Sequence, residues 1–405
     1  MLGGGTKMAI TRNRLLDLTR LVSRAGRPMT GVDRVEFAYL VHFLKDPSAR
    51  LFGLVRSSLG FILLEHAGCD ALRRRVELGD WGPAGVLARL AQRHDPMRAR
   101  AEADLRRICL ARCLPMRLRH MLTTHIQGPV TYINTGHSNL TDRVLAGVKA
   151  MPQNRIAVLL HDTIPLDFPQ YQRPGTPERF SGFLRRVATQ ADLVICNSDQ
   201  TRRDLLRHAA PNQPQTVVAH LGVDQPLPGT APTGPWTGQP YFVTLGTIEP
   251  RKNHGFLLDL WNSVPNAHLL ICGNRGWNNA AVFDRLDARP ERVHELPGLD
   301  DGQVFALIKG AAGLLFPSHA EGYGLPPIEA TALGTPVICN DLPIYREVLG
   351  DIPIYAPVTD RYPWLEATQK LVQEHATQAT RANMDRPGID PPSWEAHFKP
   401  VLRLI

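Results

Sequence analysis

Short apolar runs alternate along this chain with longer stretches in which apolar side chains recur every three or four positions. A short run rich in Val, Ile and Leu is typical of a buried strand, and the longer pattern is typical of a helix packed on a sheet. Their alternation indicates βαβ units, in which helices cover both faces of a parallel sheet. We therefore expect an α/β fold.

Seven strands are predicted before residue 225, and a long helical insertion over residues 70–125 interrupts them after the third. Several Gly and Pro residues punctuate this insertion and divide it into separate helices. The expected strands lie near Leu15–Thr19, Leu51–Arg56, Phe61–Glu65, Val130–Asn134, Ile156–His161, Leu193–Asn197 and Val217–His220.

A stretch over residues 226–240 is too rich in Pro and Gly to form a helix or a strand. It is predicted to link a first domain, residues 1–225, to a second, residues 241–385, and a length of 405 residues suits two domains. Six further strands are expected near Tyr241–Gly246, Ala267–Cys272, Val293–Leu296, Gly313–Pro317, Pro336–Asn340 and Ile352–Tyr355.

The cysteine and apolar content limits the class of protein. Six cysteines are scattered without a Cys-x-x-Cys pair or a zinc-like spacing, so we expect no disulfide framework and no structural metal. The longest apolar runs fall far short of the ~20 residues that cross a bilayer, and the start of the chain leads into Arg-rich sequence instead of a signal core. We therefore expect a cytoplasmic protein.

Positive charge is concentrated in the first part of the chain. Residues 1–150 hold 24 Lys and Arg against 12 Asp and Glu, whereas the whole chain has a net charge of +8. Either these are solvated Arg-rich helix faces, or they attract an anionic membrane surface or an anionic acceptor. Nucleic acid is not an expected partner, because the Arg clusters are not interleaved with aromatic residues.

Unusual groups follow several of the predicted strands, at the strand ends where doubly wound sheets bind ligands. After the strand that starts at Tyr241, Gly246 begins a turn that leads to the exposed cations Arg251 and Lys252 at the start of a helix. Cations there oppose the helix dipole, so they indicate a nearby anion such as a pyrophosphate. The alternative is a solvated pair of cations.

A second strand end, after Phe316, carries Glu321, the turn Gly322–Leu325 and then Glu329. Two glycines allow a ligand to approach the backbone, and the amides before a helix can hold a phosphate or a sugar oxygen. Glu321 could bind sugar hydroxyls and Glu329 ribose hydroxyls. The alternative is an ordinary strand-to-helix turn.

Two turns in the first domain are also candidates. His161 closes a strand, and the carboxylate of Asp162 beside it could hold the imidazole for a substrate hydroxyl. Gly31, in the turn Thr30–Arg34, could bring its amide to a phosphate. The alternatives are a structural histidine and a simple helix cap.

Taken together, these residues resemble the retaining GT-B glycosyltransferases of family 4, the glycosyl transferases group 1. GTIEPRKNHGFLLDLW resembles the pyrophosphate loop of that family, HELPGLDDGQVFALIKGA its base-side loop, and LFPSHAEGYGLPPIEATALGTPVICND its signature segment. Glu321 and Glu329, with seven residues between them, fit the glutamate pair of the family. The likeness covers residues 240–360 and, less closely, residues 158–224.

The resemblance implies a GT-B fold of two Rossmann-like domains that face each other across a cleft, with a last helix, residues 386–405, that returns to the first domain. It implies transfer of a hexose, such as mannose, from a UDP- or GDP-sugar to a cell-envelope polysaccharide, lipopolysaccharide or glycolipid, with retention of configuration. No cofactor and no metal are expected, since the chain has no Asp-x-Asp.

The resemblance also assigns roles to individual residues. Arg251 and Lys252 would neutralise the pyrophosphate, Glu321 and His161 would contact the transferred sugar, and these four are the expected catalytic residues. One departure is that the loop around Gly31 reads TGVD, where the family has a double glycine. Donor contacts are expected from Gly31, Gly246, Asn253, Gly322, Tyr323, Gly324, Leu325, Glu329, Leu296 and Gly298.

Two other functions remain open at this point. A GT-B sugar-nucleotide epimerase would share the fold, although it fits the Arg-Lys-Asn loop less well. A basic scaffold that binds membrane or nucleic acid, with an inactive second half, would explain the charge but not the joint presence of Arg251, Lys252, Glu321 and Glu329.

Overall fold

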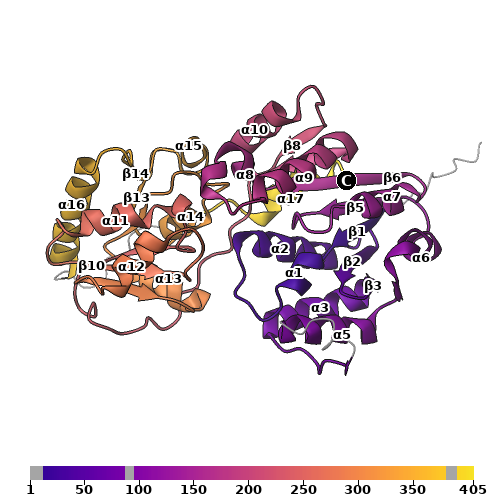
Figure 1. Cartoon of the computed structure of the whole chain (residues 1–405), viewed down its shortest axis with the longest axis horizontal. Helices are drawn as coiled ribbons and strands as arrows, with labels where there is room; N and C mark the ends of the chain where they lie inside the picture. Colours follow the sequence, from indigo (N-terminus) through magenta and orange to yellow (C-terminus); the bar gives the residue numbers. More distant parts are fainter. Residues whose placement is uncertain (1–11, 87–94, 380–389) are drawn as a thin grey trace, which may run out of the picture.

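The computed structural model describes residues 12–86, 95–379 and 390–405, which form two α/β domains beside each other (Figure 1). The first domain contains an eight-stranded sheet and the second a six-stranded sheet. Helices cover both sheets, as the alternating pattern of apolar runs predicts.

The first sheet has the strand order β4-β3-β2-β1-β5-β6-β7-β8. Its central strands β1 and β5 are buried along their whole length, although both also carry polar residues, such as Arg14 and Asp17 in β1. The strands are β1 Asn13–Asp17, β2 Leu51–Ser57, β3 Gly60–Glu65, β4 Ala111–Cys113, β5 Val130–Asn134, β6 Asn154–Leu160, β7 Leu193–Cys196 and β8 Thr216–Val218.

Nine α-helices and two short 3₁₀ helices connect these strands in the described part of the chain. They are α1 Thr19–Ser23, α2 Gly31–Lys45, α3 His66–Leu78, α5 Pro96–Ile108, η1 Pro115–Arg117, α6 Leu118–His125, α7 Asp142–Lys149, α8 Ile164–Asp167, η2 Pro169–Tyr171, α9 Thr176–Gln190 and α10 Asp199–Ala209.

The expectation of a wholly parallel first sheet and a wholly helical insertion is wrong at one edge. β3 runs antiparallel to β2, and β4, which lies within the insertion, runs antiparallel to β3. Only Ser58 and Leu59 separate β2 from β3, and two residues can form a hairpin but not a parallel crossover. The short strand β4 was missed because its three residues carry no alternating apolar pattern.

The second sheet is parallel throughout and has the order β11-β10-β9-β12-β13-β14. Its strands are β9 Tyr241–Leu245, β10 His268–Cys272, β11 Val293–Leu296, β12 Gly313–Phe316, β13 Val337–Cys339 and β14 Ile354–Tyr355. Its helices are η3 Pro250–Lys252, α11 His254–Trp261, α12 Ala280–Asp287, α13 Asp301–Gly310, α14 Leu325–Ala332, α15 Pro343–Leu349 and α16 Tyr362–Ala379.

Both sheets reverse their strand order at one point. In the second sheet the chain moves outward from β9 to β11 and then returns to place β12 on the other side of β9. In the first sheet β1 lies between β2 and β5 in the same way. Ligands of doubly wound sheets bind at such switch points, beyond the carboxyl ends of the strands.

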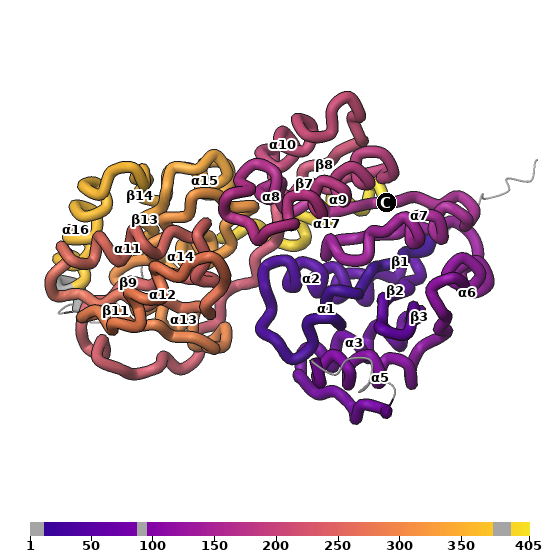
Figure 2. Tube along the Cα trace, in the orientation of Figure 1, coloured from indigo at the N-terminus to yellow at the C-terminus, as the bar shows by residue number. Residues whose placement is uncertain are grey.

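The last helix, α17 Trp394–Leu402, lies against the first domain, and Figure 2 shows this yellow segment beside the indigo and magenta elements. The hydroxyl of Tyr39 lies 2.8 Å from Nε2 of His397, and the ring of Phe398 stacks on His42 at 3.7 Å. Phe398 is 1% exposed, so α17 completes the apolar core of a domain whose sheet ends at residue 218.

Candidate active site

The loop after β9 presents Arg251 and Lys252 at the switch point of the second sheet. Gly246 begins this loop with φ +133°, and a Cβ at this position would lie 3.1 Å from Cε of Lys252. Glycine is therefore required both by the backbone conformation and by the close passage of the lysine side chain. The ammonium group of Lys252 lies 4.4 Å from the centre of the Phe316 ring, at the end of β12.

Glu321, in the loop after β12, binds both cations. Its Oε1 lies 2.7 Å from Nζ of Lys252 and 2.9 Å from Nη1 of Arg251. Burial by itself would raise the pKa of Glu321, but the positive charges of Arg251 and Lys252 lower it to about 2. Arg251 also contacts Glu249 at 2.8 Å. The protein thus places two cations and two carboxylates in one cluster.

The expectation that these two cations are exposed is therefore wrong. The Arg251 side chain is 17% exposed and that of Lys252 is 12% exposed. Glu321 supplies their counterion because the β12 loop lies next to the β9 loop in the sheet, a neighbourhood that depends on strand order and not on local sequence. An incoming anion would compete with Glu321 for the same two side chains.

Asp162 reaches this cluster from the first domain. A Cβ on Gly322 would lie 2.8 Å from Oδ2 of Asp162, so the two domains touch closely here. Burial raises the pKa of Asp162 to about 6, and Glu321 adds to this, while Arg251 acts in the opposite direction. Asp162 is thus a half-buried carboxyl group that titrates near neutrality beside Arg251 and Glu321.

His161 lies at the carboxyl end of β6, but Asp162 does not hold its imidazole as we expected. Nε2 of His161 instead donates a hydrogen bond of 2.6 Å to the carbonyl oxygen of Thr135, and the ring lies 4.9 Å from that of His137. The side chain of Asp162 turns forward and accepts from the amide of Ile164. Burial lowers the pKa of His161 to about 4, so the ring is neutral at physiological pH.

The turn before α14 exposes backbone donors to the domain boundary. Within the described residues, none of the four amides from Gly322 to Leu325 donates a hydrogen bond to another residue. Gly324, with φ +89°, precedes the first residue of α14, where the helix dipole favours an anion or a sugar oxygen. Tyr323 faces the other way and donates from its hydroxyl to the carbonyl oxygen of Leu221.

Gly31, the first residue of α2, faces this turn from the other domain. A Cβ at Gly31 would lie 3.1 Å from Cδ1 of Leu325, so this position is crowded by the second domain. Thr30, which precedes the helix, donates from both its amide and its hydroxyl to Oδ2 of Asp33. The turn is therefore a helix cap that also brings the Gly31 backbone close to α14.

Glu329, in α14, is paired with a residue that sequence reasoning missed. Nη1 of Arg34, in α2, lies 2.6 Å from Oε1 of Glu329, and Nη2 of Arg34 lies 2.8 Å from Oδ1 of Asp301. Burial raises the pKa of Glu329, and the charge of Arg34 opposes this rise. The carboxylate that we expected to bind ribose thus holds an arginine of the first domain.

The other residues expected to contact the donor lie outside the cluster of two cations and two carboxylates. Asn253, with φ +57°, donates from Nδ2 to the carbonyl oxygen of Pro317 and so ties the β9 loop to the β12 loop. Leu296 is the last residue of β11, two strands away from β9, and Gly298 lies exposed in the turn that follows. The structure therefore places Leu296 and Gly298 at one side of the site.

Sequence reasoning also missed the residues that join the two domains. Glu347, in α15, accepts hydrogen bonds from the backbone amides of Asp199 and Gln200 at 2.6 and 3.0 Å, at the start of α10. Nε2 of His220 lies 2.9 Å from the same carboxylate. A lone glutamate gives no local signal of this role, because its partners lie more than 120 residues away in the sequence.

The described residues offer neither a metal-binding cluster nor a membrane-spanning helix. Over residues 12–86, 95–379 and 390–405, no group of three or more His, Cys, Asp or Glu side chains is placed to hold a metal ion. In the same part of the chain, no helix has both the length and the apolar character needed to span a bilayer.

The architecture matches a known class of fold. A crystal structure of HepE from Anabaena, in complex with UDP and glucose, superposes with a TM-score of 0.61 at 13% identity and covers 97% of this chain and 99% of that one. The two facing Rossmann-like domains with a returning last helix are thus the GT-B fold of glycosyltransferases.

Most of the second domain matches a described family of proteins. A family described as "Glycosyl transferases group 1" matches residues 231–353, the segment that carries Arg251, Lys252, Glu321 and Glu329. This segment of the chain is similar to that family, and it makes up about a third of the chain. The match includes both loops that meet at the switch point of the second sheet.

Curated relatives include two mannosyltransferases of Escherichia coli. The serotype-specific mannosyltransferase WbdA is 32% identical over 214 residues, which are 47% of this chain and 26% of that protein. The O-antigen chain mannosyltransferase B is 26% identical over 223 residues, 51% of this chain and 58% of that protein. The chain spans about a quarter of the length of WbdA and little more than half of the second relative.

Proposed function

We propose that this chain is a glycosyltransferase that moves a hexose, with mannose as the first candidate, from a nucleoside diphosphate sugar to a glycan or glycolipid of the cell envelope. The observation that carries the proposal is the contact of Arg251 and Lys252 with Glu321 at the switch point, beside the four free amides before α14. The two mannosyltransferase relatives support the choice of sugar and acceptor.

In this proposal, Arg251 and Lys252 bind the pyrophosphate and stabilise the negative charge that grows on the leaving nucleoside diphosphate. Charged donors held in place before the reaction act most strongly on charge that develops in the transition state. Before the donor binds, Glu321 and Glu249 hold the two side chains at the switch point. Binding exchanges part of the contact with Glu321 for contact with the phosphates.

Glu321 and the amides of the turn Gly322–Leu325 would then hold hydroxyl groups of the transferred sugar, and Glu329 would accept from the ribose. His161 is neutral and buried beside Asp162, so it would act as a hydrogen-bonding group and not as a cation. With retention of configuration, the acceptor would attack the face from which the diphosphate departs, with no covalent sugar on the protein. No metal is assigned a role.

We further propose that the chain works at the inner face of the cytoplasmic membrane, where acceptors for O-antigen-like glycans would be found. The excess of positive charge in residues 1–150 supports this location. The contacts in the site do not distinguish a UDP-sugar from a GDP-sugar or select an acceptor hydroxyl, so the assay below is designed to identify both.

The test is an assay of purified full-length chain with GDP-mannose, UDP-glucose and UDP-N-acetylglucosamine, each with and without a mannose-containing acceptor. We expect one donor to release its nucleoside diphosphate only when the acceptor is present, and proton NMR of the product to show retained configuration. A control variant, Arg285→Gln in α12, removes a half-buried arginine that pairs with Asp259 away from the cluster, and it should keep full activity.

Failure to bind any nucleoside diphosphate would overturn the proposal. Conversion of the donor sugar to its epimer without transfer would replace it with an epimerase. Inverted configuration in the product would leave the transferase but refute the retaining reaction.

A further inference from the structure

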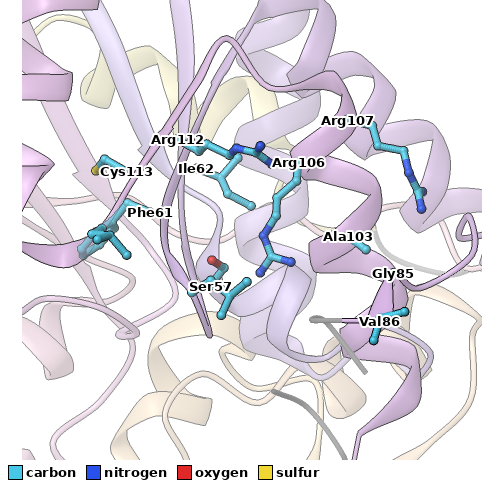
Figure 3. A pocket seen from close by; sticks show the side chains of 12 residues that line it. Ser57, Phe61, Ile62, Gly85, Val86, Ala103, Arg106, Arg107, Arg112 and Cys113 are labelled. Atoms are coloured by element: carbon cyan, nitrogen blue, oxygen red, sulfur yellow. The ribbon is translucent and has the colours of Figure 1, made fainter. Parts of the chain in front are cut away.

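A cavity of about 560 Å³ opens in the first domain, between α5 and the edge strands β3 and β4 (Figure 3). Its size lies in the range of ligand pockets in proteins. We call it the basic pocket, and its lining includes Ser57, Ile62, Ala103, Arg106, Arg112 and Leu114.

Two arginines enter the basic pocket from different elements. Arg106 comes from α5 and Arg112 from β4, and Figure 3 shows the Arg106 side chain extending toward Ser57 while Arg107 extends away from it. Burial lowers the pKa of Arg106, and the positive charge of Arg112 lowers it further. Arg106 is paired with Glu102, whereas Arg112 is exposed, so the charge of Arg112 is available to an anion in the pocket.

The carboxylates nearby do not balance these charges. Glu102 contacts Arg106 at 3.1 Å, but it also contacts Arg98 at 2.9 Å. Arg112 forms no ion pair with any residue in the described part of the chain. The basic pocket therefore keeps a net positive charge.

The other carboxylate of α5 is also engaged. Asp104 contacts both Arg75 and Arg107, and it accepts a further hydrogen bond from the amide of Gly82. Both acidic residues of α5 are thus engaged by arginines. Arg112 is therefore open to an external anion.

Exposed apolar side chains surround the mouth of the basic pocket. Leu59, Val86 and Leu114 line it and are 40%, 66% and 61% exposed, and Met116, two residues after Leu114, is 86% exposed. Large apolar side chains that are exposed together mark a surface that contacts a partner or a membrane. A cationic pocket with an apolar rim matches an anionic head group attached to a hydrocarbon chain.

The position of the basic pocket also fits the proposed reaction. Ser57 is the last residue of β2, which runs parallel to β1, so the pocket opens at the carboxyl edge of the first sheet. The same edge carries His161 and Asp162 at the end of β6, opposite the second domain. A membrane bound at this pocket would thus lie on the side of the first domain where the proposed acceptor arrives.

We infer that the basic pocket binds the phosphate head group of an anionic membrane lipid, while the apolar rim enters the bilayer. This inference rests on the proposed function in one respect: lipid binding would bring the enzyme to a lipid-linked acceptor. The binding itself needs neither a donor nor turnover, so it is measured separately from activity.

The test is sedimentation of the full chain with vesicles of phosphatidylcholine alone and with about 30% phosphatidic acid, in the absence of any nucleotide sugar. We expect Arg112→Glu to weaken binding to the anionic vesicles about tenfold, since each charge near the surface contributes about one factor of five to ten. The matched control is Arg143→Glu. Arg143 is an exposed residue of α7, and this helix packs on the opposite face of the sheet. The substitution should change binding less than about twofold.

The rim is tested by Leu114→Ser combined with Met116→Ser, which should reduce the binding that remains in about 0.5 M salt, where electrostatic attraction is screened. Both side chains are exposed, and unchanged thermal midpoints will show that the variants fold. Equal losses for Arg112→Glu and Arg143→Glu would overturn the inference in favour of diffuse attraction. Full inhibition of vesicle binding by millimolar inorganic phosphate would show that the pocket binds free phosphate and not a lipid. Equal binding to neutral and anionic vesicles would show that the pocket is not an anion site.

Discussion

Nη1 of Arg34 lies 2.6 Å from Oε1 of Glu329, so an ion pair joins α2 of the first domain to α14 of the second. The Glu329 side chain is 5% exposed, so its carboxylate is shielded from solvent while it is paired with Arg34. A ribose that uses Glu329 must therefore take the place of the arginine. The interaction couples the approach of the two domains to the occupancy of the proposed nucleotide site.

We expect Arg34→Ala to tighten the binding of nucleoside diphosphates about threefold to tenfold, because Glu329 no longer has a competing partner within the protein. Glu329→Gln should weaken the same binding. Isothermal titration with UDP and GDP measures both effects. Asp301→Asn is the control, because it removes the other partner of Arg34 and keeps the pair with Glu329. Weaker nucleotide binding by Arg34→Ala would contradict competition.

Arg251→Ala combined with Lys252→Ala should lower turnover at least about 100-fold, because both side chains would stabilise the leaving diphosphate. It should also lower the free energy of unfolding by about 3–5 kcal/mol, because Glu321 is left as a buried carboxylate without a counterion. Addition of Glu321→Gln should restore stability but not turnover. Urea unfolding and nucleoside diphosphate release separate these effects, and a triple variant that regains activity would refute the assigned role.

Glu321→Gln by itself should lower turnover more than it changes the affinity for the donor, since the proposed contact is with the reacting sugar. Glu329→Gln should raise the donor KM more than it lowers kcat, since the proposed contact is with the distant ribose. Steady-state kinetics of both variants test the division. The same pattern for both glutamates would show that it is wrong.

Asp162→Asn should change how stability depends on pH. The pKa of Asp162 is about 6 in the folded chain against 3.8 for a free Asp, so between these values the folded state binds a proton that the unfolded state has lost. The free energy of unfolding of the wild type therefore falls as pH rises through this window, by up to about 3 kcal/mol. The variant lacks this fall, so its advantage over the wild type should grow from pH 4 to pH 7. Urea unfolding at several pH values measures it, and a constant difference would count against the raised pKa.

EDTA should leave transfer largely unchanged, because the cationic pair can meet the charge of the pyrophosphate without a metal. The assay is nucleoside diphosphate release before and after chelation, followed by addition of Mg²⁺ or Mn²⁺. Complete inhibition that either metal reverses would show that the pyrophosphate site has been misread.

Much of the fold could be predicted because most buried parallel strands are short runs of apolar residues that are visible in the sequence. β5 and β11 have the predicted bounds, and the other predicted strands differ at their ends by a few residues. β4 escaped prediction because its position is defined by pairing with β3 and not by its own three residues.

The candidate site was predictable in its parts but not in its contacts. Glycine turns and charged residues after strands mark the β9 and β12 loops, whereas the partners of those charges come from distant segments. Arg34 and Glu329 are 295 residues apart in sequence, and Lys252 and Glu321 are 69 apart. Burial then decides the protonation of Asp162 and His161, and no local pattern reports burial at a domain boundary.

The return of α17 has a consequence for the order in which the chain can fold during synthesis. Tyr39 and Phe43 belong to the first domain, yet Phe398 packs against both, so the segment that closes this core is made hundreds of residues later. The first domain therefore leaves the ribosome with an open apolar surface, which stays open while the second domain is made. Final closure of the first core comes only when residues 394–402 emerge, by which time the second domain is able to fold independently.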